Sequence, residues 1–77
     1  MTFEATNLDA MEPADLREWA DKLPDTLPSR LHTLLAGYAR RKADAMDARL
    51  DGRIKWALNL EAQCEQIYFF LPPECRW

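Results

Sequence analysis

The stretch that decides the fold is ARLDGRIKWAL, residues 48–58, because one helix ends within it and another begins. Gly52 is one of only two glycines in the chain, and glycine readily adopts the left-handed conformation that ends a helix. Ile54 then restarts the apolar period. The stretch therefore predicts two helices, residues 27–50 and 53–71, that double back on each other as a long antiparallel hairpin.

The turn at Asp51 and Gly52 also predicts which residues of the two helices face each other. Antiparallel neighbours should have residue numbers that sum to about 103. This register places Lys42 opposite Glu61 and Tyr38 opposite Glu65, so we expect polar contacts between these pairs.

Prolines set the remaining bounds. Pro13 suits the first position of a helix, because its missing N–H would have no partner there, and the apolar spacing after it predicts a helix over residues 12–23. Residues 1–11 are predicted to be a loose arm, because its first part shows no periodicity; Phe3 and Leu8 are the candidates to pack back on the helices. Pro72 and Pro73 cannot continue the last helix, so residues 72–77 are predicted to be an aromatic tail.

Length and composition predict a single all-α domain over residues 1–77. The 77 residues include no valine and only two isoleucines, whereas alanine, leucine and charged helix formers are abundant. The expected architecture is a three-helix minibundle built on the long hairpin. A core of this size contributes little net stability, and this favours a dimer.

The last helix carries more apolar surface than one neighbour can cover. One flank of this helix is predicted to face the other helix of the hairpin. It consists of Ile54, Ala57, Leu58, Cys64, Tyr68 and Leu71. The first helix should cover part of the remainder. We expect the uncovered part to be an interface, formed by Trp56, Leu60, Ile67, Phe70 and Trp77. The alternative is that the whole arc is the core of a monomeric bundle.

Few residues suggest catalysis or metal binding. His32 is the only histidine, and Cys64 and Cys75 are the only cysteines, too few for a self-contained zinc site. Cys64 is expected in the core and Cys75 in solvent. We predict no enzyme activity, no metal and no cofactor. The sequence shows no secretory signal and no apolar run of about 20 residues, so we expect a cytoplasmic protein outside the membrane.

Charge is distributed unevenly along the chain. Residues 40–55 contain six basic residues against three aspartates, and Arg40, Arg41, Arg49 and Arg53 are the candidates for phosphate binding. The interleaved aspartates and the net charge of −3 argue against nucleic-acid binding. Residues 1–25 contain seven acidic residues against two basic ones. This excess suits docking onto a basic protein, and the candidate residues are Asp9, Glu12, Asp15 and Glu18.

The C-terminal half resembles small α-helical proteins encoded by phages and prophages. The matching pattern is an alanine-rich helix, a glycine turn and an ending of the form C..IY..LP...RW, carried by Tyr38, Ala43, Met46, Arg49, Gly52, Ile54, Ala57, Glu61, Cys64, Ile67, Tyr68, Leu71, Pro72, Arg76 and Trp77. The resemblance implies a non-enzymatic protein that binds a host protein in the bacterial cytoplasm and inhibits or redirects it, for example a defence complex or a regulator. Two alternatives stay open: an accessory protein that contacts nucleic acid through residues 40–55, and a small-molecule sponge with a pocket between subunits.

Overall fold

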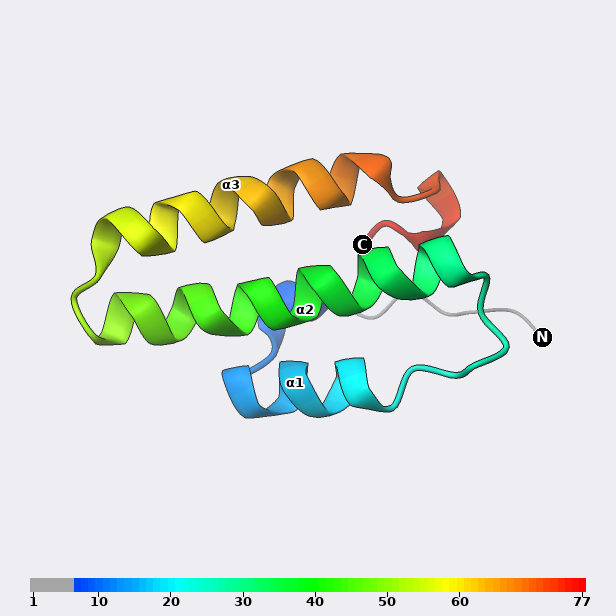
Figure 1. Ribbon diagram of the computed structural model, residues 1–77, viewed down its shortest axis with the longest axis horizontal. Helices are drawn as coiled ribbons and strands as arrows, with labels where there is room; N and C mark the ends of the chain where they lie inside the picture. The colour runs from blue at the N-terminus through cyan, green and yellow to red at the C-terminus, as the bar shows by residue number, and fades with distance from the viewer. Residues whose placement is uncertain (1–6) are drawn as a thin grey trace.

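The computed structural model describes residues 7–77. Within this range the chain has helices and no strand, which confirms the all-α prediction. In chain order, the elements are η1 (Leu8–Ala10), α1 (Pro13–Asp21), α2 (Ser29–Leu50), α3 (Ile54–Phe70) and η2 (Pro73–Cys75), where η denotes a short 3-10 helix. The longest helix, α2, lies between α1 and α3, and α3 runs in the opposite direction to α2 (Figure 1).

The bounds of the α-helices differ from the predicted ones by at most two residues. The start of α2 shows why. Pro28 has an extended ψ of 138° and precedes the helix as its N-cap, whereas the prediction placed it inside the first turn. Such differences are of the size by which helix ends fray.

The prediction of a loose arm needs correction for its last part. Leu8–Ala10 form η1, and the side chain of Leu8 is 0% exposed. The side chain of Asn7 accepts a hydrogen bond from the backbone N–H of Asp9 at 3.1 Å and so caps this short helix. Leu8 was one of the two residues of the arm named as candidates to pack back, and it does so; the short helix itself was not predicted, because the arm shows no periodicity. Residues 1–6 of the predicted arm lie outside the described residues.

The Asp51–Gly52 turn ends α2 as the sequence indicated. Gly52 has a φ of +76°, in the left-handed region. The N–H of Arg53 donates to the carbonyl of Ala48 at 2.8 Å, and the N–H of Gly52 donates to the carbonyl of Arg49 at 3.1 Å. This pair of bonds is the Schellman motif, which satisfies the last carbonyls of a helix.

Helices α2 and α3 meet through small residues. Five alanines of α2 are buried, and α3 buries Ala57, Leu60 and Cys64. A Cβ atom added to Gly37 would lie 3.8 Å from Cδ1 of Ile67, in ordinary van der Waals contact. Small contact residues allow helix axes to approach closely. Little room is then left between the helices for the large apolar side chains of α3.

The first helix packs on α2, so the expectation that it covers part of the last helix needs correction. Leu16 and Ala20 of α1 are buried in the core. Arg17 donates to Asp44 at 2.9 Å and to Asp47 at 2.6 Å, both on α2. These ion pairs are exposed and each contributes only about 0–1 kcal/mol. They nevertheless fix α1 on the side of α2 that leaves the outer face of α3 uncovered.

Candidate functional site

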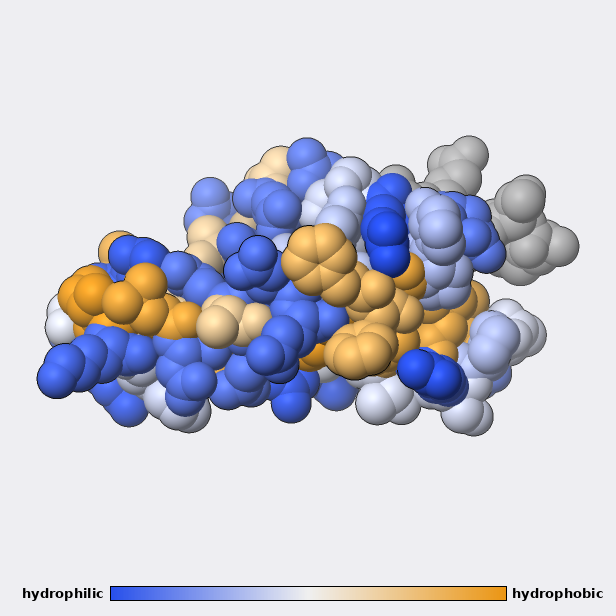
Figure 2. Space-filling view, turned by 90° about the horizontal axis from the view of Figure 1, so that it is seen from above, coloured by the Kyte–Doolittle hydropathy of each residue, from blue (hydrophilic) through white to orange (hydrophobic). Residues whose placement is uncertain are grey.

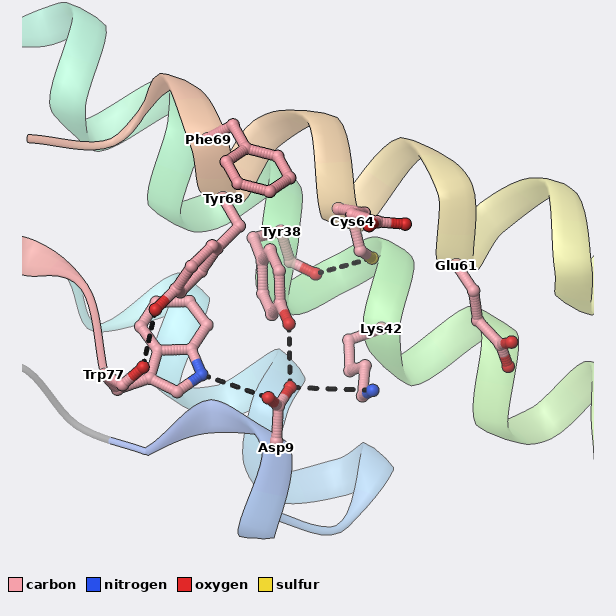
Figure 3. Close-up of a pocket in the computed structure, with 9 residues that line it drawn as sticks. Asp9, Tyr38, Lys42, Glu61, Cys64, Tyr68, Phe69 and Trp77 are labelled. Carbon is pink, nitrogen blue, oxygen red and sulfur yellow. Dashed lines mark hydrogen bonds and ion pairs between the residues drawn. The ribbon is translucent and has the colours of Figure 1, made fainter.

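A cleft of about 380 Å³ lies where η1, α2, α3 and the C-terminal tail meet (Figure 3). Its lining combines aromatic rings with charged groups: Asp9, Tyr38, Lys42, Glu61, Cys64, Glu65, Tyr68, Phe69 and Trp77. The cleft joins the two ends of the described chain, because Asp9 and Trp77 both belong to it.

Asp9 is the centre of this junction. Its carboxylate accepts hydrogen bonds from the hydroxyl of Tyr38 at 2.7 Å and from the indole N–H of Trp77 at 3.2 Å. The Nζ atom of Lys42 lies 3.5 Å from the same carboxylate. Burial acts to raise the pKa of Asp9, but the two hydrogen bonds and the lysine charge outweigh it and hold the pKa below its ordinary value. Asp9 was predicted to face a partner; instead its carboxylate is occupied within the chain.

Trp77 is half-buried and packs back on the molecule. Its ring meets those of Tyr38 and Tyr68 edge to face, at centroid distances of 4.8 and 4.9 Å. The hydroxyl of Tyr68 also donates to the main-chain oxygen of Trp77 at 2.6 Å. Such aromatic pairs contribute about 0.5–1.5 kcal/mol beyond the area they bury. Trp77 was predicted as an interface residue and as an anchor of the tail against the hairpin or a partner; in the structure its half-buried ring packs on the chain's own core.

Arg76 holds the tail against the end of α3. Its guanidinium donates to the carbonyl oxygens of Leu71 at 3.1 Å and Phe69 at 2.9 Å. These carbonyls lie at a helix C-terminus, where the backbone lacks partners and a positive charge is favourable. Arg76 and Trp77, the last two residues, therefore both hold the tail against the helices.

The cleft offers no activated nucleophile. Burial raises the pKa of the Cys64 thiol to about 11, so this group stays protonated at neutral pH. Burial and the bond to Asp9 also raise the pKa of Tyr38, which keeps it a donor. Cys75 was expected in solvent but is buried, at 5% exposed, because η2 folds the tail back.

His32 lies elsewhere, in a shallow hollow beside Asp25 and Ser29. Within residues 7–77 no hydrogen bond involves its side chain, and no group of three or more His, Cys, Asp or Glu residues is placed to hold a metal ion.

Glu61 and Glu65 do not make the contacts with α2 that the sequence predicted. Both oxygens of Glu61 accept from the guanidinium of Arg49, with a distance of 2.7 Å from Nη2, whereas the prediction paired Glu61 with Lys42. The hydroxyl of Tyr38, expected to meet Glu65, bonds Asp9. Lys42, like the hydroxyl of Tyr38, lies close to Asp9, so the unforeseen position of η1 accounts for both differences.

The predicted interface residues of α3 divide into exposed and buried ones. Trp56 is 44% exposed and Phe70 is 66% exposed, and Ile67 is half-buried beside them. Leu60 is only 4% exposed, so its place in an interface needs correction: it belongs to the contact with α2. The other three lie along one edge of α3, which we call the Phe70 edge.

A second set of exposed apolar residues lies outside the predicted interface: Leu50 is 84% exposed, Ile54 45%, Leu58 53% and Phe69 65%. Sequence reasoning missed the first three, whereas it placed Phe69 on the polar side of the helix, where the structure has it. In the view from above, apolar surface gathers over the end where α2 and α3 join and again further along α3 (Figure 2). Ile54 and Leu58 were predicted to face the hairpin, but the helix is rotated so that small residues occupy that side. The small size of Ala57 and Cys64 was the signal that could have revealed this rotation.

An apolar groove of about 540 Å³ adjoins the Phe70 edge. It runs between the start of α2, the end of α3 and the tail. Its lining is mostly apolar, with Arg30 and Glu74 as the charged members, and consists of Pro28, Arg30, Leu31, Leu34, Phe70, Pro72, Glu74 and Cys75.

Three of the four predicted acidic residues do come together. Glu12, Asp15 and Glu18 line a groove of about 510 Å³ on α1, beside the half-buried ring of Trp19. Glu18 forms an ion pair with Lys22 in the same groove, at 2.6 Å. The surface of α1 is therefore acidic, on the side of the molecule away from α3.

The predicted phosphate-binding arginines are largely engaged in contacts within the chain. Arg40 pairs with Asp21 at 2.9 Å. Arg41 donates to the side-chain oxygen of Gln63 at 2.9 Å, and Arg49 is bonded to Glu61. Within residues 7–77 only Arg53 of the four has no such contact, so the group does not present a continuous basic surface.

No known protein-family model, curated protein or solved structure matches this chain. Among residues 7–77, no helix is long and apolar enough to cross a membrane.

Proposed function

We propose that this protein acts by binding another protein, without a catalytic step, and that its main contact is the groove at the Phe70 edge. The observation that carries the proposal is Phe70 itself. A phenylalanine that is 66% exposed at the mouth of an apolar groove is a site where a partner gains free energy by excluding water. Aromatic side chains in such positions are typical anchors of interfaces.

The charge of the molecule specifies the kind of partner. The chain has a net charge of −3, and α1 concentrates acidic groups around its groove. Because α1 lies away from α3, these groups act mainly at long range, by steering a basic protein toward the molecule. The partner we propose therefore carries an apolar segment on a basic surface.

The resemblance to small phage-encoded proteins supports a bacterial host protein as this partner. In that setting the protein would dock in the cytoplasm and block or redirect its host target, as a homodimer. Contact with nucleic acid is a weaker proposal, because Arg40, Arg41 and Arg49 are already bonded to other side chains.

The central cleft has a structural role in this proposal. Asp9, Tyr38 and Trp77 satisfy one another, and within residues 7–77 every buried side-chain nitrogen or oxygen has a hydrogen-bond partner. No polar atom there requires a ligand.

Photo-crosslinking tests the proposed contact. We would place benzoylphenylalanine at Phe70, and at Phe69 as the matched control, in a bacterial host. The two positions are adjacent and about equally exposed, at 66% and 65%, but only Phe70 lines the groove. We expect an adduct with one host protein from position 70 only, and that protein, once purified, should bind the wild-type chain. Equal adducts with the same host protein from both positions, or an adduct whose purified protein does not bind, would refute the assignment.

A further inference from the structure

We propose that a second copy of this chain packs antiparallel against the outer side of α3. The contact surface, called here the outer seam, consists of Leu50, Ile54, Leu58, Ala62 and Phe69. It lies on a different edge from Phe70, so the proposal extends the homodimer of the proposed function without depending on the groove.

The spacing of the outer seam is that of a helix packing surface. Ile54, Leu58, Ala62, Glu65 and Phe69 follow one another in steps of four, four, three and four residues, so they stay on one side of the helix. All five are exposed. In Figure 2, apolar surface lies over the α2–α3 turn and again further along α3, with hydrophilic surface between the two patches. Helix α3 therefore carries a row of exposed residues at helix spacing, apart from both the side that faces α2 and the Phe70 edge.

The outer side of α3 is also poor in charge. Between Trp56 and Phe70 the helix carries only two charged residues, Glu61 and Glu65, although charged residues make up 30% of the whole chain. Glu61 is already bonded to Arg49. Depletion of charge is the compositional mark of the centre of an interface.

A second copy suits this surface because the seam is complementary to itself. If two copies of α3 pair antiparallel with residue numbers that sum to about 120, Leu58 lies opposite Ala62 of the second copy. A large side chain then meets a small one, as close helix packing requires. The two-fold axis repeats this contact, since both partners of such an interface use the same surface.

The same register pairs charged residues that lie beside the outer seam. Lys55 falls opposite Glu65 of the second copy, and Glu65 falls opposite Lys55 in return. Phe69 then lies beyond the first residue of α3 in the second copy, at the α2–α3 turn, where Leu50 is 84% exposed. Over its sixteen positions the helical part of the seam is about 24 Å long. It therefore fits within the 41 Å length of the molecule.

Light scattering from purified protein between about 1 and 200 µM tests this interface. We expect the wild type to have twice the mass of one chain at the higher concentrations, and Leu58→Glu to weaken dimerisation at least tenfold. Phe70→Glu, on the other edge, is the matched control and should leave the dimer intact. Circular dichroism of each variant would show that the helices are retained. A monomeric wild type at 200 µM, or an unchanged Leu58→Glu dimer, would overturn the proposal.

A charge swap tests the antiparallel register. Lys55→Glu and Glu65→Lys should each weaken the dimer several-fold, because each places like charges opposite each other. The double variant should restore the wild-type dissociation constant to within about twofold. Lys55 and Glu65 are ten residues apart on one helix, about 15 Å, so restoration cannot come from a contact within one chain. A double variant as weak as the single ones would overturn this register.

Discussion

Asp9 shows how one residue can close a small fold. Its carboxylate collects a hydroxyl from Tyr38, an indole N–H from Trp77 and the ammonium of Lys42. Asp9 and Trp77 are 68 positions apart in the chain. A sequence pattern records local spacing, so it predicted Trp77 as an anchor but gave no indication that its partner was Asp9.

The pH dependence of stability tests this junction. The pKa of Asp9 is held below its ordinary value, so its contribution is fully present above about pH 4 and is lost as the pH falls through the lowered, folded-state pKa. We expect Asp9→Asn to lower the free energy of unfolding at pH 7 by about 1–2 kcal/mol and to flatten this acid limb. Urea unfolding between pH 2 and pH 7 would measure both effects.

The control for the Asp9 variant is Tyr38→Phe, which removes one donor and keeps the ring against Trp77. It should cost about 1 kcal/mol at pH 7. An Asp9→Asn protein with wild-type stability at pH 7 and an unchanged acid limb would show that the junction contributes nothing.

At the scale of elements, the sequence predicted the helices better than their faces. Gly52 and the prolines mark chain positions where a helix cannot continue, so the bounds were recovered to within two residues. The orientation of α3 about its own axis was not predicted correctly, because its apolar residues cover more than half of its circumference. Which side of α3 faces inward depends on the small residues of α2, and therefore on both helices together. Leu60 was therefore placed outside and Leu58 inside, the reverse of what the structure has.

The two glycines provide a matched test of the α2–α3 turn. A Cβ atom at Gly52 would meet nothing within 4 Å, but the φ of +76° disfavours any L side chain. We expect Gly52→Ala to lower the free energy of unfolding by about 1–2 kcal/mol. Gly37 is helical, and its added Cβ would lie 2.8 Å from Nη1 of Arg41, the movable end of a long side chain.

Gly37→Ala should therefore be neutral or stabilise by up to about 1 kcal/mol, the helix propensity difference. Thermal or urea unfolding of the two variants measures the contrast. Equal effects of the two substitutions would argue against a strained turn at Gly52.

At the scale of the whole molecule, α2 lies between α1 and α3, and this arrangement explains why apolar side chains of α3 stay exposed. A first helix packed against both others would have covered α3, as the sequence predicted. Because α1 is fixed to α2 by its buried residues and by the ion pairs of Arg17, α3 keeps apolar residues exposed on two edges. We assign one edge to a second copy and the other to a protein partner. Which of the two edges binds a second copy and which binds another protein depends on the shape of each surface. The order of apolar residues along the chain does not contain this information.

We propose that the protein binds its target at the Phe70 edge. The most direct test is the dissociation constant of the purified crosslinked partner for wild type and for Phe70→Glu, each checked for retained helicity. In the complex, the variant loses the burial of the phenylalanine ring and buries a carboxylate instead. This should cost more than about 1.4 kcal/mol of binding free energy, which corresponds to a factor of ten in the dissociation constant. We predict that Phe70→Glu raises the dissociation constant at least tenfold. A folded Phe70→Glu variant that binds within twofold of wild type would contradict the claim.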